Sequence, residues 1–257
     1  MNLDMTQSLG VCYKSPLQIA RVVSEEWASR NLYCPACTSD KLSQTPTNTR
    51  AIDFSCPECS QVFQVKSSRQ WNQRKIVDAG YDPMIAAIRS DRVPNLVVMQ
   101  YTESWKVRNM LLVPHFFFTE SVIERRKPLS VTARRAGWVG CNILLDEIPS
   151  DGKINLVDNG FISDVRRIRK HFDHIRGLSK LKGEVRGWTL DVLKVVRKLN
   201  KPEFTLSEIY DYEPMLAAAY PGNRNVRPKI RQQLQKLREL KLLEFVSPGR
   251  YRIIESN

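Results

Sequence analysis

Long apolar runs are missing from this sequence. No apolar stretch in its 257 residues approaches the ~20 residues that a membrane-spanning helix needs. The start, Met1 to Asp4, lacks the basic region of a secretory signal peptide. Internal repeats and low-complexity tracts are absent as well, and the length allows one large or two modest domains, each with a core. We therefore expect a cytoplasmic protein with reduced thiols rather than a membrane-bound or secreted one.

Acidic residues are in deficit. The chain has 40 Lys and Arg against 27 Asp and Glu, a formal net charge of +13, and the excess is present both before and after residue 186. Such an excess is the electrostatic footprint of phosphate binding, so DNA is expected to contact both parts of the chain. The alternative is a basic protein whose charge only aids solubility.

Four of the six cysteines form two Cys-x-x-Cys pairs, Cys34 with Cys37 and Cys56 with Cys59. Pairs separated by about 15–20 residues are typical of a structural Zn²⁺ site, because four thiolates complete a closed tetrahedral shell. Four buried or disulfide-linked cysteines are the alternative, which the lack of a secretory signal makes the weaker interpretation. The two remaining cysteines, Cys12 and Cys141, are expected to be buried free thiols.

The second cysteine pair lies in the turn of an expected hairpin. Residues 50–54 and 61–66 read as its two short strands. Gln64 and Lys66 are two apart and share one face, and the hairpin can bring Asp53 alongside that face. A carboxylate, an amide oxygen and an ammonium group then form one cluster that can hold a hard cation and a phosphate oxygen. A solvated strand face explains this pattern equally well.

The remaining elements up to residue 182 are expected in the order helix, strands, helix, strand. Helices are expected at 16–30 and at 71–90 with a break at 80–81, and residues 163–182 are expected to form a basic helix and linker. Strands are expected at 95–101, at 110–118 with an interruption at Pro114, at 139–145 and at 154–162.

The C-terminal segment predicts a winged helix. Helices are expected at 188–199, from 204 to about 221, and from the capping residue Asn225 onward, followed by a β-wing formed by 243–246 and 250–254. The third helix has an apolar stripe and an opposite polar, basic face. That face carries Lys229, Arg231, Gln232, Gln235 and Lys236. We expect it to enter the major groove of DNA, with a solvated helix face as the alternative.

Five blocks of sequence, at 33–37, 53–59, 132–142, 186–189 and 230–235, resemble the DpnI-type methyl-directed restriction endonucleases, a branch of the PD-(D/E)xK nucleases. The resemblance runs nearly end to end. It implies an α/β (α+β) PD-(D/E)xK nuclease core with a four-cysteine zinc knuckle at residues 1–182, followed by an α+β winged helix at 183–257. It also implies Mg²⁺-dependent cutting of double-stranded DNA whose GATC sites carry N6-methyladenine. We expect a monomer in solution, with transient pairing on DNA as the alternative.

The resemblance gives the hairpin cluster a catalytic interpretation. Asp53, Gln64 and Lys66 would be the catalytic residues. Mg²⁺ would be held by Asp53, the Gln64 amide oxygen, the Val65 carbonyl, water and the scissile phosphate, and Lys66 would orient or help deprotonate the attacking water.

Glutamine at position 64 departs from the family pattern, which has an acidic residue there. An amide removes a negative charge but leaves one carbonyl oxygen as a ligand, so we expect one metal ion rather than two. Mrr-like nucleases resemble this fold and also use glutamine there. Glu25 or Glu26 could supply the missing carboxylate, although an exposed helix face is the favoured interpretation of both. A non-catalytic zinc and winged-helix DNA-binding regulator with a decayed nuclease site remains the alternative function, and a zinc-ribbon adaptor is a third class.

Methyl reading requires an apolar contact beside the adenine. Contact with one methyl group offers only ~1–3 kcal/mol. A palindromic site carries two methyl groups, so a protein that recognises the site with two DNA-binding domains would multiply its preference for methylated over unmethylated DNA. Trp138, beside the basic residues Arg134 and Arg135, is the candidate sensor in the first domain. A lone tryptophan is more often a core residue, but the match over 132–142 favours a functional interpretation.

Overall fold

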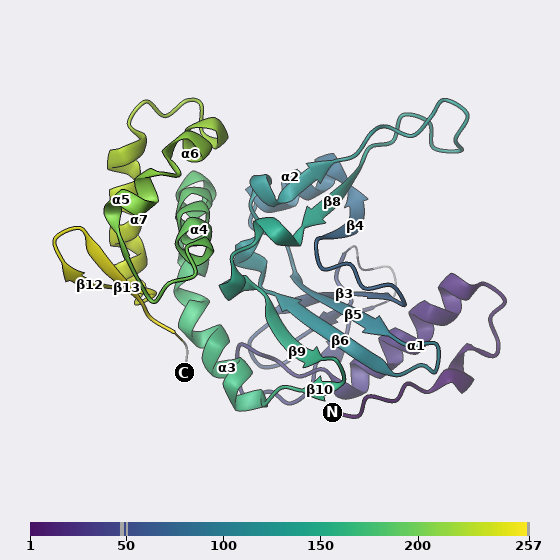
Figure 1. The fold of residues 1–257 in the computed structure, drawn as a ribbon. Helices are drawn as coiled ribbons and strands as arrows, with labels where there is room; N and C mark the ends of the chain where they lie inside the picture. The colour runs from purple at the N-terminus through teal and green to yellow at the C-terminus, as the bar shows by residue number, and fades with distance from the viewer. Residues whose placement is uncertain (47–48, 50, 256–257) are drawn as a thin grey trace. The chain divides into compact units, whose positions relative to one another are not determined.

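The computed structural model describes residues 1–46, 49 and 51–255, and Arg50, the expected start of the first hairpin strand, lies outside them. The chain divides into two compact units. The first unit is Met1–Asn72, Pro94–His115 and Gly152–Asp173, and the second is Gln73–Val93, Phe116–Asp151 and His174–Asn257. Figure 1 shows both units and labels most of their helices and strands. Among the described residues, none of the helices has both the length and the apolar character to cross a membrane.

The first unit is built on a seven-stranded sheet with the order β1-β2-β3-β5-β6-β9-β10. Its strands are β1 Ser43–Gln44, β2 Phe54–Ser55, β3 Val62–Ser68, β5 Asn95–Tyr101, β6 Val107–Val113, β9 Ile154–Asp158 and β10 Phe161–Ile162. β3 and β5 pair in parallel, whereas β5 and β6, β6 and β9, and β9 and β10 pair antiparallel. The expected strand at 95–101 is therefore confirmed in the centre of the sheet, where nearly all of its residues are buried.

Helix α1, Pro16–Asn31, confirms the helix expected at 16–30. A proline fits its first turn because the N–H that proline lacks has no partner within the helix there. Trp27 is buried, and its indole N–H donates to the carbonyl of Asn2 at 2.8 Å. The hairpin expected at 154–162 also forms, since Asn159 and Gly160 both adopt positive φ angles between β9 and β10.

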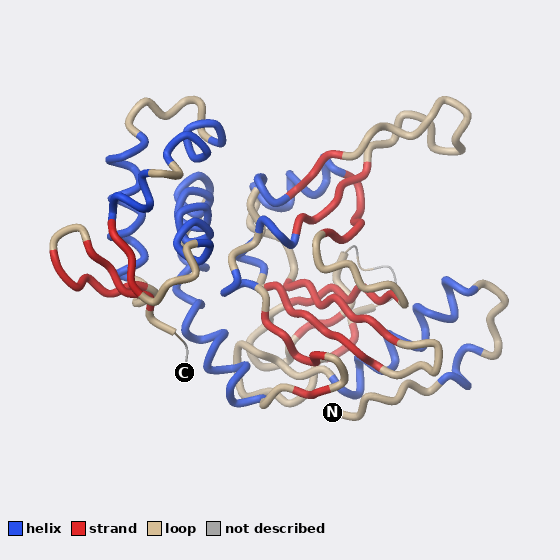
Figure 2. The backbone as a smooth tube through the Cα atoms, viewed as in Figure 1, coloured by secondary structure: helices blue, strands red, loops and turns tan. Residues whose placement is uncertain are grey.

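The second unit contains a three-stranded sheet with the order β4-β8-β7, together with helix α2. Its elements are β4 Lys75–Gly80, α2 Tyr81–Arg89, β7 Ile123–Arg125 and β8 Gly140–Leu144. The strand expected at 139–145 is confirmed by β8. Figure 2 shows β4 as a strand.

Two expectations for these regions were wrong. Residues 75–80 form a strand rather than the first half of a helix, because Ile76 pairs with Ile143 of β8 and burial alternates along the segment. The strand expected at 110–118 runs from Val107 to Val113 instead, and His115–Phe117 forms a 3-10 helix. Pro114 separates the two, since proline has no N–H to donate to a sheet.

The C-terminal part of the second unit is the expected winged helix. Its elements are α4 Gly183–Lys198, β11 Glu203–Thr205, α5 Leu206–Tyr210, α6 Glu213–Ala219, α7 Val226–Glu239, β12 Leu243–Ser247 and β13 Arg250–Ile253. The single second helix expected from the sequence is two, and Thr205 and Glu208 form a capping box at the start of α5. The buried stripe of α7 is confirmed at Val226, Ile230, Leu234 and Leu237.

Ion pairs join α4 to the rest of the second unit. Arg197 holds Asp151 through two contacts, of 2.8 and 2.5 Å, and the side chains are only 13% and 3% exposed. Arg186, which is buried, lies 2.8 Å from Asp91. Lys194 also pairs with Glu147. These charged groups thus fix the winged helix within this unit.

We expect Asp151→Ala to lower the free energy of unfolding by about 3–5 kcal/mol, because it leaves the buried guanidinium of Arg197 without its main partner. Urea unfolding of the full chain measures this loss. Glu255→Ala is the matched control, since it removes an exposed carboxylate from the same arginine and should cost no more than ~1 kcal/mol. Equal losses in the two variants would contradict a buried ion pair.

Candidate active site and zinc centre

The four paired cysteines converge, although they are far apart in the sequence. Their Sγ atoms lie within 4.8 Å of one another, with Cys34 to Cys59 and Cys37 to Cys56 both at 3.5 Å. A tetrahedral zinc with Zn–S bonds of about 2.3 Å would place its sulfurs about 3.8 Å apart. The cluster therefore fits a zinc ion, and these four cysteines could bind one. Outside it, Cys141 is buried as expected, whereas Cys12 is exposed, which corrects that expectation.

The cysteines differ in how readily they ionise. Burial raises the pKa of Cys34, and it raises the pKa of Cys37 to about 11. Burial acts on Cys56 in the same direction. There, however, hydrogen bonds from the backbone amides of Cys59 and Glu58 and from neighbouring thiols outweigh it and lower the pKa to about 7. Of these three cysteines, Cys56 is therefore the one whose metal-binding, anionic form the surrounding chain favours.

The second cysteine pair lies in the β2–β3 turn, and this hairpin positions the predicted catalytic residues. Phe54 and Phe63 are paired across the hairpin and buried. Because side chains alternate along a strand, Gln64 and Lys66 project from the opposite face. Asp53 immediately precedes β2, and its backbone N–H donates to the Phe63 carbonyl at 2.9 Å. The fold thus places Asp53 on the same face as Gln64 and Lys66.

A hydrogen bond fixes the carboxylate of Asp53 over the β3 backbone. Its Oδ2 accepts from the N–H of Val65 at 2.7 Å, between the positions of Gln64 and Lys66. The predicted catalytic residues Asp53, Gln64 and Lys66 are all half-buried, so solvent and a bound molecule can still reach each of them. The structure thus places Asp53, Gln64 and Lys66 on one face of the hairpin, and a carboxylate, an amide oxygen and an ammonium group are suited to a hard cation and a phosphate.

Helix α1 lies beside this cluster. The Ser67 hydroxyl of β3 donates to the hydroxyl of Ser24 at 2.9 Å. Glu25 pairs with Arg21 at 2.6 Å, and Glu26 pairs with Arg30 within the same helix. The two carboxylates considered as spare metal ligands are therefore in ion pairs along α1.

Arg21 was not singled out from the sequence. Its hydrogen bond to Glu25 is the main cause that raises its pKa, and the negative charge of Asp53 adds to the effect. Arg21 therefore brings a second cation near the catalytic cluster, besides Lys66. The signal in the sequence was its spacing of four residues from Glu25, which is typical of an ion pair on one helix face.

The predicted sensor Trp138 lies at the base of an exposed loop, residues 126–139, which extends from the β4-β8-β7 sheet (Figure 1). Its ring packs on the backbone of Gly140, where an added Cβ would lie only 2.9 Å from the ring. Arg135 lies over the ring at 4.9 Å, and both Arg134 and Arg135 are exposed. Trp138 itself is half-buried, with Gly140 against its ring and the guanidinium of Arg135 over it.

The five residues of α7 that were predicted to contact DNA lie outside the buried stripe of the helix. Arg231, Gln232 and Gln235 are exposed, whereas Lys229 and Lys236 are half-buried. Some of these side chains have neighbours within the domain. Lys236 pairs with Glu239 at 2.6 Å, and Arg231 donates to the Tyr210 hydroxyl at 3.2 Å. Gln233, by contrast, is buried and accepts a hydrogen bond from Thr189, so it belongs to the core.

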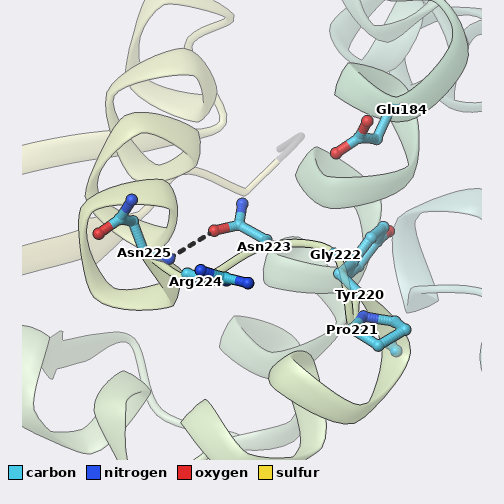
Figure 3. Close-up of a pocket in the computed structure, with 8 residues that line it drawn as sticks. Glu184, Tyr220, Pro221, Gly222, Asn223, Arg224 and Asn225 are labelled. Carbon is cyan, nitrogen blue, oxygen red and sulfur yellow. Dashed lines mark hydrogen bonds between the residues drawn. The ribbon is translucent and has the colours of Figure 1, made fainter.

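An open hollow lies where α7 begins (Figure 3). It is lined by Glu184 and residues 219–225. Asn225 occupies the predicted capping position, yet its side chain makes no capping hydrogen bond, and its backbone N–H donates to Asn223 Oδ1 at 2.8 Å. The exposed Arg224 adds a cation at the positive end of the helix. Asn223 and Arg224 were not expected to line a hollow, because a loop has no periodic pattern in the sequence that would indicate it.

Two protein families match this chain. A model of the Dam-replacing family, DpnI, matches residues 1–181. A model of the Dam-replacing HTH domain matches residues 184–253. The matches therefore cover the cysteine cluster, the β2–β3 hairpin and the winged helix, and they agree with the resemblance seen in the five sequence blocks.

Proposed function

Because this chain belongs to the Dam-replacing family, DpnI, we propose that it is a Mg²⁺-dependent endonuclease that cuts double-stranded DNA at GATC-like sites carrying N6-methyladenine. Membership of this family implies a methylation-dependent restriction endonuclease, and the HTH match implies DNA as the partner. The observation that carries the proposal is the Asp53 carboxylate held over Val65, between Gln64 and Lys66. We propose that the protein acts from a monomeric state in solution.

The oxygen donors of the hairpin fit a hard cation. Asp53, the amide oxygen of Gln64 and the carbonyl of Val65 would hold Mg²⁺, which prefers oxygen ligands and keeps several waters. When bound, the ion would neutralise charge on the phosphate and make its water more acidic. Since Gln64 is neutral and Glu25 is paired with Arg21, the site offers one anionic ligand, which favours one metal over two.

Lys66 performs the part of the chemistry that belongs to the protein. Lys66 projects from the face of β3 that also carries Gln64, and the N–H of Val65, the residue between these two, holds the carboxylate of Asp53. From there it can orient the attacking water, help remove its proton and stabilise the charge that develops on the phosphate. The N–H of Val65 keeps Asp53 in place while these groups act.

We propose that the preference for methylated over unmethylated DNA comes from two separate sets of contacts with the methylated site. In the first, Trp138 contacts the methyl group while Arg134 and Arg135 hold the phosphates. In the second, α7 enters the major groove, where glutamine can read adenine and lysine or arginine can contact phosphates. The residues of this second set are Lys229, Arg231, Gln232, Gln235 and Lys236. One methyl contact gives only ~1–3 kcal/mol, so reading twice gives a larger selection than either contact alone.

Plasmid from two hosts tests the proposal. We expect the purified protein with Mg²⁺ to cut plasmid from a host that methylates adenine in GATC, and to leave plasmid from a non-methylating host intact. Gel electrophoresis measures both. EDTA and a parallel preparation of Lys66→Ala control for contaminating nucleases. Equal cutting of the two plasmids would contradict methyl dependence. Binding of methylated DNA without any cutting would instead support a regulator with a decayed nuclease site.

A further inference from the structure

One arginine closes the loop that carries the first cysteine pair. Arg169 is on α3, Val165–Ile175, more than 100 residues from that loop, and both belong to the first unit. Its Nε donates to the carbonyl of Cys34 at 3.2 Å. Its Nη2 donates to the carbonyls of Thr38 and Ser39, at 3.0 and 2.8 Å. A single guanidinium group thus gathers three backbone carbonyls around the cysteine loop.

Two further contacts fix the direction of Arg169. Its Nη2 lies 3.0 Å from the carboxylate of Asp40, and its guanidinium lies over the ring of Tyr33, 5.5 Å from the ring centre. The side chain is 24% exposed, so it is largely withdrawn from water. Arginine suits this position because its planar group offers five N–H donors in a fixed arrangement, which lysine cannot reproduce.

The two halves of the cysteine cluster have different support. Cys56 and Cys59 lie between β2 and β3, whose ladder holds them. Cys34 and Cys37 lie in a loop without helix or strand, and within it the N–H of Cys34 donates to the carbonyl of Ser39 at 3.0 Å. Arg169 therefore supplies the first pair with the rigidity that the hairpin gives to the second.

We propose that Arg169 is a positioning residue of the zinc centre, which holds residues 34–40 in the conformation that binds metal. It does not contact the sulfurs itself but acts through the carbonyls that flank them. Groups that orient metal ligands in this way typically change metal affinity by about 10–100-fold when they are removed. The role is independent of the proposed nuclease activity, because it concerns retention of zinc only.

Zinc release from the full-length protein tests the proposal. Arg169→Met keeps much of the side-chain volume and removes every donor, and we expect it to release zinc to a chromogenic chelator about 10-fold faster or more. Arg169→Lys should give an intermediate rate. The matched control is Arg166→Met, which removes an exposed arginine from the same helix and should release zinc at the wild-type rate.

The outcomes separate cleanly. Faster release from the Arg169 variants, with circular dichroism unchanged at saturating zinc, supports the proposal. Release at the wild-type rate from soluble Arg169→Met overturns it. If Arg169→Met does not fold, Arg169→Lys decides in the same way, because faster release supports the role and an unchanged rate overturns it. Absence of zinc from the wild-type protein also overturns it, whatever the protein does to DNA.

Discussion

Lys66→Ala should abolish cleavage of methylated DNA while leaving its binding largely intact. The variant removes the cation that we propose stabilises the charge developing on the phosphate, and a single such group is worth about 10²–10³ in kcat. Asp53→Asn should have a comparable effect. An asparagine oxygen can still accept from the N–H of Val65, so this variant keeps the local hydrogen bond and removes only the negative charge that holds the cation.

Single-turnover cleavage and a separate binding assay measure the two effects. Lys106→Ala is the matched control, since it removes an exposed lysine from the same unit and should cut at the wild-type rate. Gln64→Glu should retain activity and lower the Mg²⁺ concentration needed, because it restores an anionic ligand. Wild-type cleavage by Lys66→Ala would show that the proposed site is wrong, and complete inactivation by Gln64→Glu would argue against Gln64 as a ligand.

Cys56→Ser should yield insoluble or unfolded protein. At structural zinc sites the binding free energy is folding free energy, about 10–16 kcal/mol in zinc-finger peptides at neutral pH. Cys56 is buried within the β2–β3 turn, so loss of the metal would also release the hairpin that carries Asp53. Elemental analysis of the wild-type protein should find about one zinc per chain.

The control for this variant is Cys12→Ser, because Cys12 is exposed and lies outside the cysteine cluster. It should fold and retain zinc like the wild type. A well-folded wild-type protein without metal would exclude the structural zinc site, whereas soluble, zinc-loaded Cys56→Ser would show that Cys56 is not an essential zinc ligand.

The elements that the sequence predicted well are those whose pattern is local. The apolar stripe of α7 repeats at helical spacing, and the strand at 95–101 is a short apolar run. Residues 75–80 were misassigned because their strand depends on pairing with β8, more than 60 residues away. A partner so distant leaves little trace in a short window of sequence.

The residues of the candidate site also divide into those with a local sequence pattern and those that depend on distant partners. The Cys-x-x-Cys spacing and the Asp53–Gln64–Lys66 hairpin are compact in sequence. The structure gathers the four cysteines, and it holds the Asp53 carboxylate on the N–H of Val65, between Gln64 and Lys66. Arg169 could not be found in this way, since its contacts with the cysteine loop span about 130 residues. A lone arginine in a basic helix carries no signal of its carbonyl partners, which the fold alone supplies.

Exchange of reading domains between relatives is constrained by the ion pairs of α4. The two family models meet between residues 181 and 184, and a chimaera joined there would separate Arg186 from Asp91 and Arg197 from Asp151. In a host without an acidic residue at the position of Asp91 or Asp151, the arginine would lose its partner. A functional hybrid must therefore contain the acidic partners as well as the helix. The part that is transferred between relatives would then comprise separate segments of the sequence rather than one continuous C-terminal piece.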